Sequence, residues 1–106
     1  MTSFSRGDVV IVDLGMVAKA RPCVVVSIKA PDQQRNMSVV VPMTTEVRGG
    51  AFEIAFPKPA WLRQESVVNL LGIAGLDNSK IERRIATFPS EKILEIESGL
   101  RRLLGL

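Results

Sequence analysis

Two runs of β-branched residues, separated by a polar connection, place the strongest constraint on how this chain folds. Residues 23–28 read CVVVSI and residues 38–41 read SVVV, while residues 29–36 between them are mainly polar and contain a Pro-Asp pair. Valine and isoleucine favour strands, and proline followed by aspartate favours a turn. The sequence therefore predicts two adjacent antiparallel strands.

This pairing has a chemical consequence at the open end of the two strands. Arg21-Pro22 precedes the first run, and Thr44-Thr45 follows the second. Antiparallel pairing brings the start of the first strand close to the end of the second, so an arginine and a threonine share one edge of the sheet. A guanidinium beside hydroxyl groups is suited to binding phosphate.

Other short segments have the same strand character. Runs of β-branched or alternating apolar residues, bounded by glycine, proline or polar turns, occupy residues 9–14, 52–56, 66–73 and 84–88. Many short strands with frequent turn signals are typical of a small barrel or a strongly curved sheet. The predicted fold class is therefore mainly β, with an antiparallel curved sheet.

Proline and glycine refine this expectation at particular positions. Pro42 falls late in the third strand, residues 38–43, and predicts a sheet edge or a bulge there, because proline has no N–H for the ladder. Gly72 and Gly75 predict a bulge or a close approach of two backbone segments. Residues 57–64 form a predicted loop that Trp61 anchors to the core.

The C-terminal segment changes from strand to helix periodicity. Its apolar residues recur at helical spacing, at Ile93, Ile96, Leu100, Leu103 and Leu104. Ser90 is the expected N-cap, Glu91 and Arg101-Arg102 match the helix dipole, and Gly105 is the expected stop. The sequence therefore predicts one amphipathic helix packed across the barrel. All 106 residues are expected to form one domain, 1–106.

Composition excludes several classes of site. The chain has no histidine and one cysteine, Cys23, so histidine-based acid–base chemistry, a multi-thiolate zinc site and an internal disulfide are not possible. A single cysteine, a polar N-terminus and the lack of a long apolar run predict a cytoplasmic protein with no membrane segment. A net charge of +3 favours an acidic or polyanionic partner.

Several motifs, in this order and spacing, resemble the PemK/MazF family of toxins. They are RGD followed by VVIVDLG from Arg6, KARP followed by CVVVS from Lys19, VVVPMTT followed by EVRGGAFEIAF from Val39, SVVNLLGI from Ser66, and the terminal SEKILEIESGLRRLLGL from Ser90. The likeness covers nearly the whole chain. It implies an SH3-like small barrel, as in the related CcdB toxins, that forms a homodimer.

The resemblance also implies an activity and its residues. It implies a sequence-selective, metal-independent endoribonuclease without a cofactor, which cleaves single-stranded RNA (mRNA) and is bound by a cognate antitoxin. The family's catalytic arginine and threonine fall on Arg21 and Thr44. Attack of a 2′-hydroxyl on the neighbouring phosphorus needs charge stabilisation and orientation, which these two side chains supply without metal or histidine.

Further RNA contacts are expected around these two residues. Lys19 and Arg48 flank the site as phosphate contacts, and Thr45 adds a second hydroxyl. The strand beginning at Ser66 lacks the glutamine and arginine of the family pattern, which leaves Asn69 as its polar group able to contact a base. Glu46 is the carboxylate nearest to Thr44 in sequence and is a candidate base.

Two other functions remain open on the sequence. One is a non-catalytic toxin that poisons DNA gyrase through the same fold, as CcdB does, without a need for Arg21 beside RNA. The other is an inactive barrel that binds only RNA or an antitoxin. The presence of both Arg21 and Thr44 favours the ribonuclease.

Overall fold

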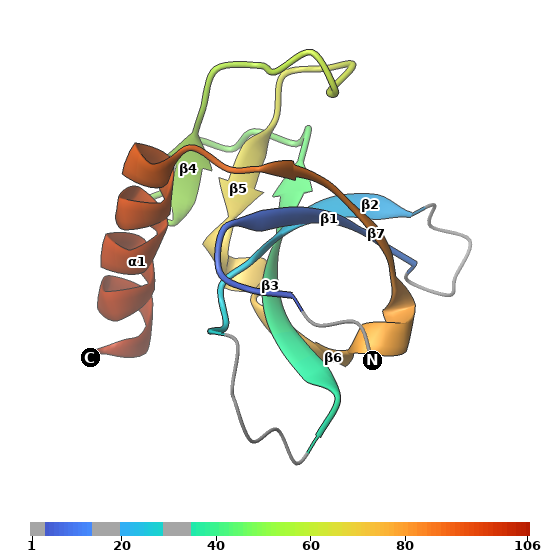
Figure 1. Ribbon diagram of the computed structural model, residues 1–106. Helices are drawn as coiled ribbons and strands as arrows, with labels where there is room; N and C mark the ends of the chain where they lie inside the picture. The colour runs from blue at the N-terminus through green and yellow to red at the C-terminus, as the bar shows by residue number, and fades with distance from the viewer. Residues whose placement is uncertain (1–3, 14–19, 29–34) are drawn as a thin grey trace.

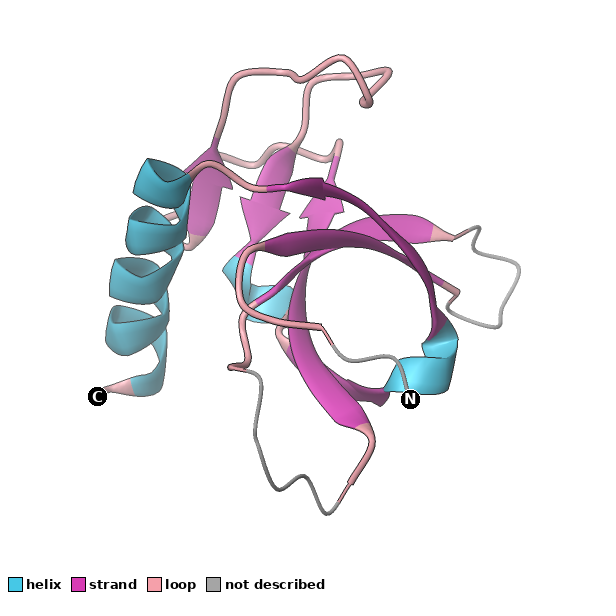
Figure 2. Ribbon diagram, viewed as in Figure 1, coloured by secondary structure: helices cyan, strands magenta, loops and turns pink. Residues whose placement is uncertain are grey.

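The computed structural model describes residues 4–13, 20–28 and 35–106. The predicted contact residue Lys19 and the Pro-Asp turn within residues 29–36 lie outside these ranges. The described residues form a seven-stranded antiparallel sheet with one α-helix and two short 3₁₀ helices (Figures 1 and 2). In chain order the elements are β1 (Asp8–Val12), β2 (Arg21–Val25), β3 (Met37–Thr44), β4 (Glu53–Ala55), β5 (Val67–Asn69), η1 (Leu70–Gly72), β6 (Ala74–Asp77), η2 (Asn78–Lys80), β7 (Ile81–Thr87) and α1 (Ser90–Leu104).

The predicted pairing of the two valine-rich runs is confirmed. β2 and β3 are antiparallel neighbours, with Val24 opposite Val41 and Val25 opposite Val40. β2 begins at Arg21, two residues before the valine-rich run 23–28, and ends within that run at Val25. β1 also ends earlier than predicted, at Val12, and β7 begins earlier, at Ile81.

The central strands β1, β2 and β3 are buried on both faces, which explains their uninterrupted valine runs. Val9, Val24 and Val41 lie side by side in the register and pack in a cluster with Ile96 of α1. Their neighbours along the strands face a second cluster, on the concave side of the curved sheet, made of Val10, Val12, Cys23, Val25, Val40 and Ile81. Continuous apolar runs are what a strand covered on both faces requires.

β3 is the central strand, so of the two alternatives predicted for Pro42 the sheet edge is wrong, while the pairing of β3 is interrupted there on one side. Pro42 pairs with Cys23 of β2 on one side. On the other side, β3 pairs with β6 as far as Val40. It pairs with a different strand, β5, from Met43 onward. The proline therefore lies where the neighbouring strand is interrupted, and its missing N–H leaves no ladder bond unmade on that side.

The predicted strand 66–73 is correspondingly divided. It consists of β5, then the 3₁₀ helix η1, after which β6 continues along β3. Gly72 at the end of η1 passes so close to Pro42 that a Cβ atom there would lie 2.7 Å from the Pro42 Cγ. The predicted close approach at Gly72 is confirmed, whereas a Cβ at Gly75 would meet no described atom within 4 Å.

The helix α1 covers the convex side of the sheet near β4 and η1 (Figure 1). Glu91 lies in its first turn, Arg101 and Arg102 lie in its last turn, and Gly105 ends it in a left-handed conformation with φ of 73°. The predicted N-cap is wrong, because Pro89 occupies the cap position and Ser90 is the first helical residue. Among the residues that the structure describes, no side chain caps this end.

The predicted fold class, a curved antiparallel sheet with a C-terminal helix, is confirmed. Within the described residues, no helix has the length and apolar character needed to cross a membrane.

Candidate functional site

A pocket of about 330 Å³ lies at the end of the sheet where β2 begins and β3 ends. We call it the β2–β3 pocket. Its lining contains two arginines, two threonines and, among the described residues, no carboxylate; the lining residues are Arg21, Pro22, Met43, Thr44, Thr45, Leu62, Arg63, Gln64 and Ser66. The antiparallel pairing thus brings Arg21 and Thr44 to one site, as expected from the sequence.

Arg21 is exposed at the first position of β2. Within the part of the chain that the structure describes, no hydrogen bond or ion pair engages its guanidinium. An arginine in this state keeps all of its N–H donors and its full charge for a ligand. Arg21 is therefore placed to bind an anion that enters the pocket.

Cys23 lies two residues further along β2 and faces the core. Burial raises the pKa of its thiol to about 11, although the nearby charge of Arg21 acts in the opposite direction. The thiol is 3% exposed, so it remains protonated at neutral pH and is a packing group. The pocket's chemistry consequently rests on arginine, hydroxyl and amide groups.

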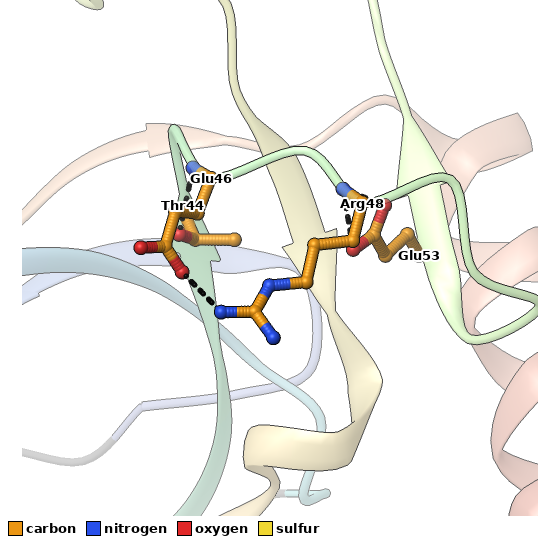
Figure 3. A network of polar contacts seen from close by, with 4 residues as sticks. All are labelled: Thr44, Glu46, Arg48 and Glu53. Atoms are coloured by element: carbon orange, nitrogen blue, oxygen red, sulfur yellow. Dashed lines mark hydrogen bonds and ion pairs between the residues drawn. The ribbon is translucent and has the colours of Figure 1, made fainter.

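Thr44 ends β3 with its hydroxyl already oriented. The Thr44 Oγ1 accepts a hydrogen bond of 3.1 Å from the backbone N–H of Glu46 (Figure 3). Because a hydroxyl has one proton and two lone pairs, this bond leaves the proton free to be donated. Thr44 can thus donate to a phosphate oxygen from a fixed position. Thr45, the next residue, is exposed on the same pocket.

The opposite wall of the pocket comes from the loop between β4 and β5. Arg63, Gln64 and Ser66 of this loop line the pocket, and the sequence analysis did not identify them as site residues. The signal that could have found them is the adjacent anchor: Trp61 packs against the main hydrophobic cluster, as predicted. An anchored loop presents its next polar residues in a defined place.

Arg48 belongs to a separate ionic network and does not line the β2–β3 pocket. Its guanidinium donates to the Glu46 carboxylate at 3.0 Å, and its backbone N–H donates to the Glu53 carboxylate at 3.2 Å (Figure 3). Glu53 also accepts from the N–H of Gly49 at 2.9 Å. The candidate base Glu46 is therefore paired with Arg48, outside the pocket lining.

Asn69 serves the local backbone. Its Oδ1 accepts a 3.2 Å hydrogen bond from the N–H of Leu71, which makes it the N-cap of η1. It does not line the β2–β3 pocket. Contacts of Asn69, Arg48 and Thr45 with RNA remain predictions, and Lys19 lies outside the described residues.

A second concave site lies along β7, with a volume of about 350 Å³. We call it the β7 pocket; its lining residues are Phe4, Asp8, Asn78, Ile81, Glu82, Arg83 and Arg84. Here each arginine has an acidic neighbour. Arg84 lies 3.8 Å from Asp8, and Arg83 lies 3.8 Å from Glu82.

Comparison with protein families finds one match that covers most of the chain. The profile described as PemK-like, MazF-like toxin of type II toxin–antitoxin system matches residues 5–104. Among curated protein sequences, none matches this chain.

Solved structures of similar fold cover the chain from end to end. An endoribonuclease in complex with its cognate antitoxin, from a mycobacterial species, has a TM-score of 0.81 and 26% identity over 98% of this chain and 97% of its own. A MazE–MazF complex from Deinococcus radiodurans has a TM-score of 0.79 and 26% identity over 100% of both chains. A mycobacterial endoribonuclease has a TM-score of 0.80 and 25% identity over 100% of this chain and 95% of its own.

Proposed function

The chain belongs to the PemK-like, MazF-like toxin family of type II toxin–antitoxin systems, and from this membership we propose that it is a metal-independent, sequence-selective endoribonuclease. One observation carries the proposal. Arg21, whose guanidinium has no partner among the described residues, and Thr44, whose hydroxyl proton is free to donate, line one open pocket. Similar folds include proteins described as endoribonucleases, which supports the same conclusion.

The pocket is suited to a phosphate of single-stranded RNA. Arginine binds phosphate oxygens through two parallel N–H donors, and a threonine hydroxyl adds a third donor beside them. No described carboxylate lines the pocket to compete with the phosphate or to repel it. An extended, unpaired strand fits this rim better than a duplex, because the pocket lies at one end of the β2–β3 pair, beside the β4–β5 loop.

Cleavage proceeds by attack of the 2′-oxygen on the adjacent phosphorus. The 2′-O–P bond forms and the P–O5′ bond breaks, while the 2′-hydroxyl loses a proton and the departing 5′-oxygen gains one. The products are a 2′,3′-cyclic phosphate and a 5′-hydroxyl. Solvent takes up the 2′ proton and returns one to the 5′-oxygen, so the route balances with no water consumed and without metal or cofactor.

Arg21 acts in this reaction through its charge. Negative charge grows on the non-bridging oxygens in the pentavalent transition state, and a guanidinium bound to these oxygens stabilises it there. An arginine has a pKa above about 12, which makes it a poor proton acceptor near neutral pH. The Thr44 hydroxyl donates a hydrogen bond to the same oxygens and orients the phosphate for in-line attack.

The proposed partners follow from the same family membership. We expect a cognate antitoxin whose extended segment covers the β2–β3 pocket, and two related structures are complexes with an antitoxin.

We also expect a homodimer. Leu94, Leu104 and Leu106 are 65%, 52% and 83% exposed along the C-terminal helix and its end, and a second copy would cover apolar surface of this kind. Light scattering at several protein concentrations measures the molar mass and so tests for the dimer.

The decisive experiment is cleavage of a long single-stranded RNA in the presence of EDTA, with analysis of the product ends. Wild type should cut at a short recurring sequence and leave cyclic-phosphate and 5′-hydroxyl ends. Thr44→Val removes the donor with little change in volume and should slow cleavage by about 10- to 100-fold. Thr87→Val at the exposed end of β7 is the matched control and should cut like wild type.

Failure of antitoxin-free, folded wild type to cut RNA would contradict the proposal. Tight binding to DNA gyrase in that case would favour the CcdB-like alternative. RNA binding without any product would favour an inactive barrel. Cutting that stops in EDTA and returns with added Mg²⁺ would contradict the metal-independent route.

A further inference from the structure

We propose that the loop of residues 57–66 forms a second, specificity-determining wall of the RNA site, in which Arg63 holds the phosphate next to the scissile one and Gln64 contacts a base. The inference rests on the proposed ribonuclease function. It extends that function from the scissile phosphate to the neighbouring nucleotide.

Position is the first argument. Arg63 and Gln64 come from the β4–β5 loop, yet they line the same pocket as Arg21 and Thr44. Both side chains are exposed, and neither has a side-chain hydrogen bond or ion pair within residues 4–13, 20–28 and 35–106. Their donors and acceptors are consequently free for a ligand that already touches Arg21.

The loop is held in place by contacts of its own, which is the second argument. The Lys58 Nζ donates to the Leu62 carbonyl at 3.0 Å, and the Leu62 N–H donates to the Pro59 carbonyl at 3.1 Å. Trp61 and Leu62 pack against the main hydrophobic cluster. The Arg63 backbone therefore follows directly from an anchored segment.

The other side of the loop is equally fixed. Ser66 is buried, and its hydroxyl donates to the Gln64 carbonyl at 3.2 Å. β5 begins one residue later and pairs with Thr44 through Val67. The backbone of a wall built on such supports loses little conformational entropy when RNA docks, which leaves mainly the side chains to be ordered.

Chemistry separates the roles of the two residues. A guanidinium binds phosphate without reading sequence, so Arg63 sets affinity and the position of the strand. The Gln64 amide has both a donor and an acceptor, the pair of groups that recognises the edge of an unstacked base. With Arg21 on the scissile phosphate, the second arginine of the pocket meets the next phosphate along the strand.

The first test measures binding separately from cleavage. The probe is a single-stranded 2′-O-methyl RNA, which cannot be cut because it has no free 2′-hydroxyl. Arg63→Ala should weaken binding by about tenfold and reduce the slope of log affinity against log salt by about 0.7, the value for one phosphate contact on a single strand. Arg83→Ala, an exposed arginine of β7, is the matched control and should change neither quantity.

The second test uses cleavable RNA and reads out sequence preference. Gln64→Ala should lower the preference for one base beside the cut by about tenfold, while cleavage of the best site persists. Arg63→Ala should raise KM and leave both kcat and the preferred sequence unchanged.

The outcomes distinguish this proposal from the one on which it rests. If wild type cuts RNA while Arg63→Ala matches Arg83→Ala in affinity, salt slope and KM, the second wall is overturned and the ribonuclease stands. If wild type binds the 2′-O-methyl probe through Arg63 but cuts no RNA, the wall stands as a binding site and the ribonuclease is overturned. Unchanged base preference in Gln64→Ala overturns the base contact.

Discussion

The β2–β3 pocket and the β7 pocket are similar in size, about 330 and 350 Å³, and each is lined by two arginines. They differ in what surrounds those arginines. In the β7 pocket, Asp8 and Glu82 lie beside them, and Arg84 also donates to the Thr87 hydroxyl at 3.0 Å. In the β2–β3 pocket no described carboxylate lines the wall.

The comparison shows that a count of basic residues does not identify an anion site. A guanidinium with an acidic neighbour gains little from a phosphate, because the ligand must compete with a carboxylate already present. A guanidinium without one offers its whole charge. Arg21 and Arg63 of the β2–β3 pocket, which have no acidic neighbour among the described lining residues, are therefore the arginines that indicate an anion site.

The largest effect is expected from removal of Arg21. Arg21→Ala should slow RNA cleavage by about 100- to 1,000-fold, since the transition state loses the positive charge beside its phosphate oxygens. Arg83→Ala in the β7 pocket should leave the rate near that of wild type. Single-turnover cleavage of RNA by both variants, with circular dichroism to verify folding, measures the difference. Equal cleavage rates for the two variants would contradict the claim that only the β2–β3 pocket binds the scissile phosphate.

A smaller effect is expected from the support beneath the pocket. Gly72→Ala places a Cβ atom against the rigid Pro42 ring, two residues before Thr44, and should lower the free energy of unfolding by about 1–3 kcal/mol. Gly75→Ala on β6 faces open space and should have little effect. Urea unfolding of both variants measures the change; equal stability would show that the ring can move aside.

Exchange of charge between the pockets should make them more alike. Gln64→Glu places a carboxylate in the β2–β3 pocket, as in the β7 pocket, and should weaken RNA binding by about tenfold. Glu82→Gln frees Arg83 and should add a weak, salt-sensitive RNA affinity at the β7 pocket. Binding of 2′-O-methyl RNA at several salt concentrations measures both changes. Unaltered binding by Gln64→Glu would place the RNA elsewhere.

The smallest effect concerns the core below Arg21. The pKa of the Cys23 thiol is raised to about 11, from 9.0. As pH rises above 9, the unfolded chain releases this proton while the folded chain keeps it, so stability falls, by about 1 kcal/mol at pH 10. Urea unfolding of wild type and Cys23→Val from pH 8 to 10 isolates this contribution. A difference that does not vary with pH would contradict the raised pKa.

The sequence was sufficient to predict the pairing of β2 with β3 and hence the meeting of Arg21 with Thr44. Two valine-rich runs joined by a short polar connection favour antiparallel pairing, and this pairing places the two side chains at the same end of the strand pair. It was not sufficient at Pro42. The interruption by η1 that accommodates this proline depends on Gly72, which lies far along the chain.

What the sequence determined by itself was six of the seven strands, all but β6, the helix with its Gly105 stop, and one half of the pocket, because these follow from local propensity and from neighbours in the chain. Only the tertiary structure decided that Arg63 and Gln64 complete the pocket, that Gly72 meets Pro42, and that Arg84 lies beside Asp8. The reason is physical. A loop side chain takes its position from the core that anchors the loop, and a charged group is free or paired according to what folding brings beside it.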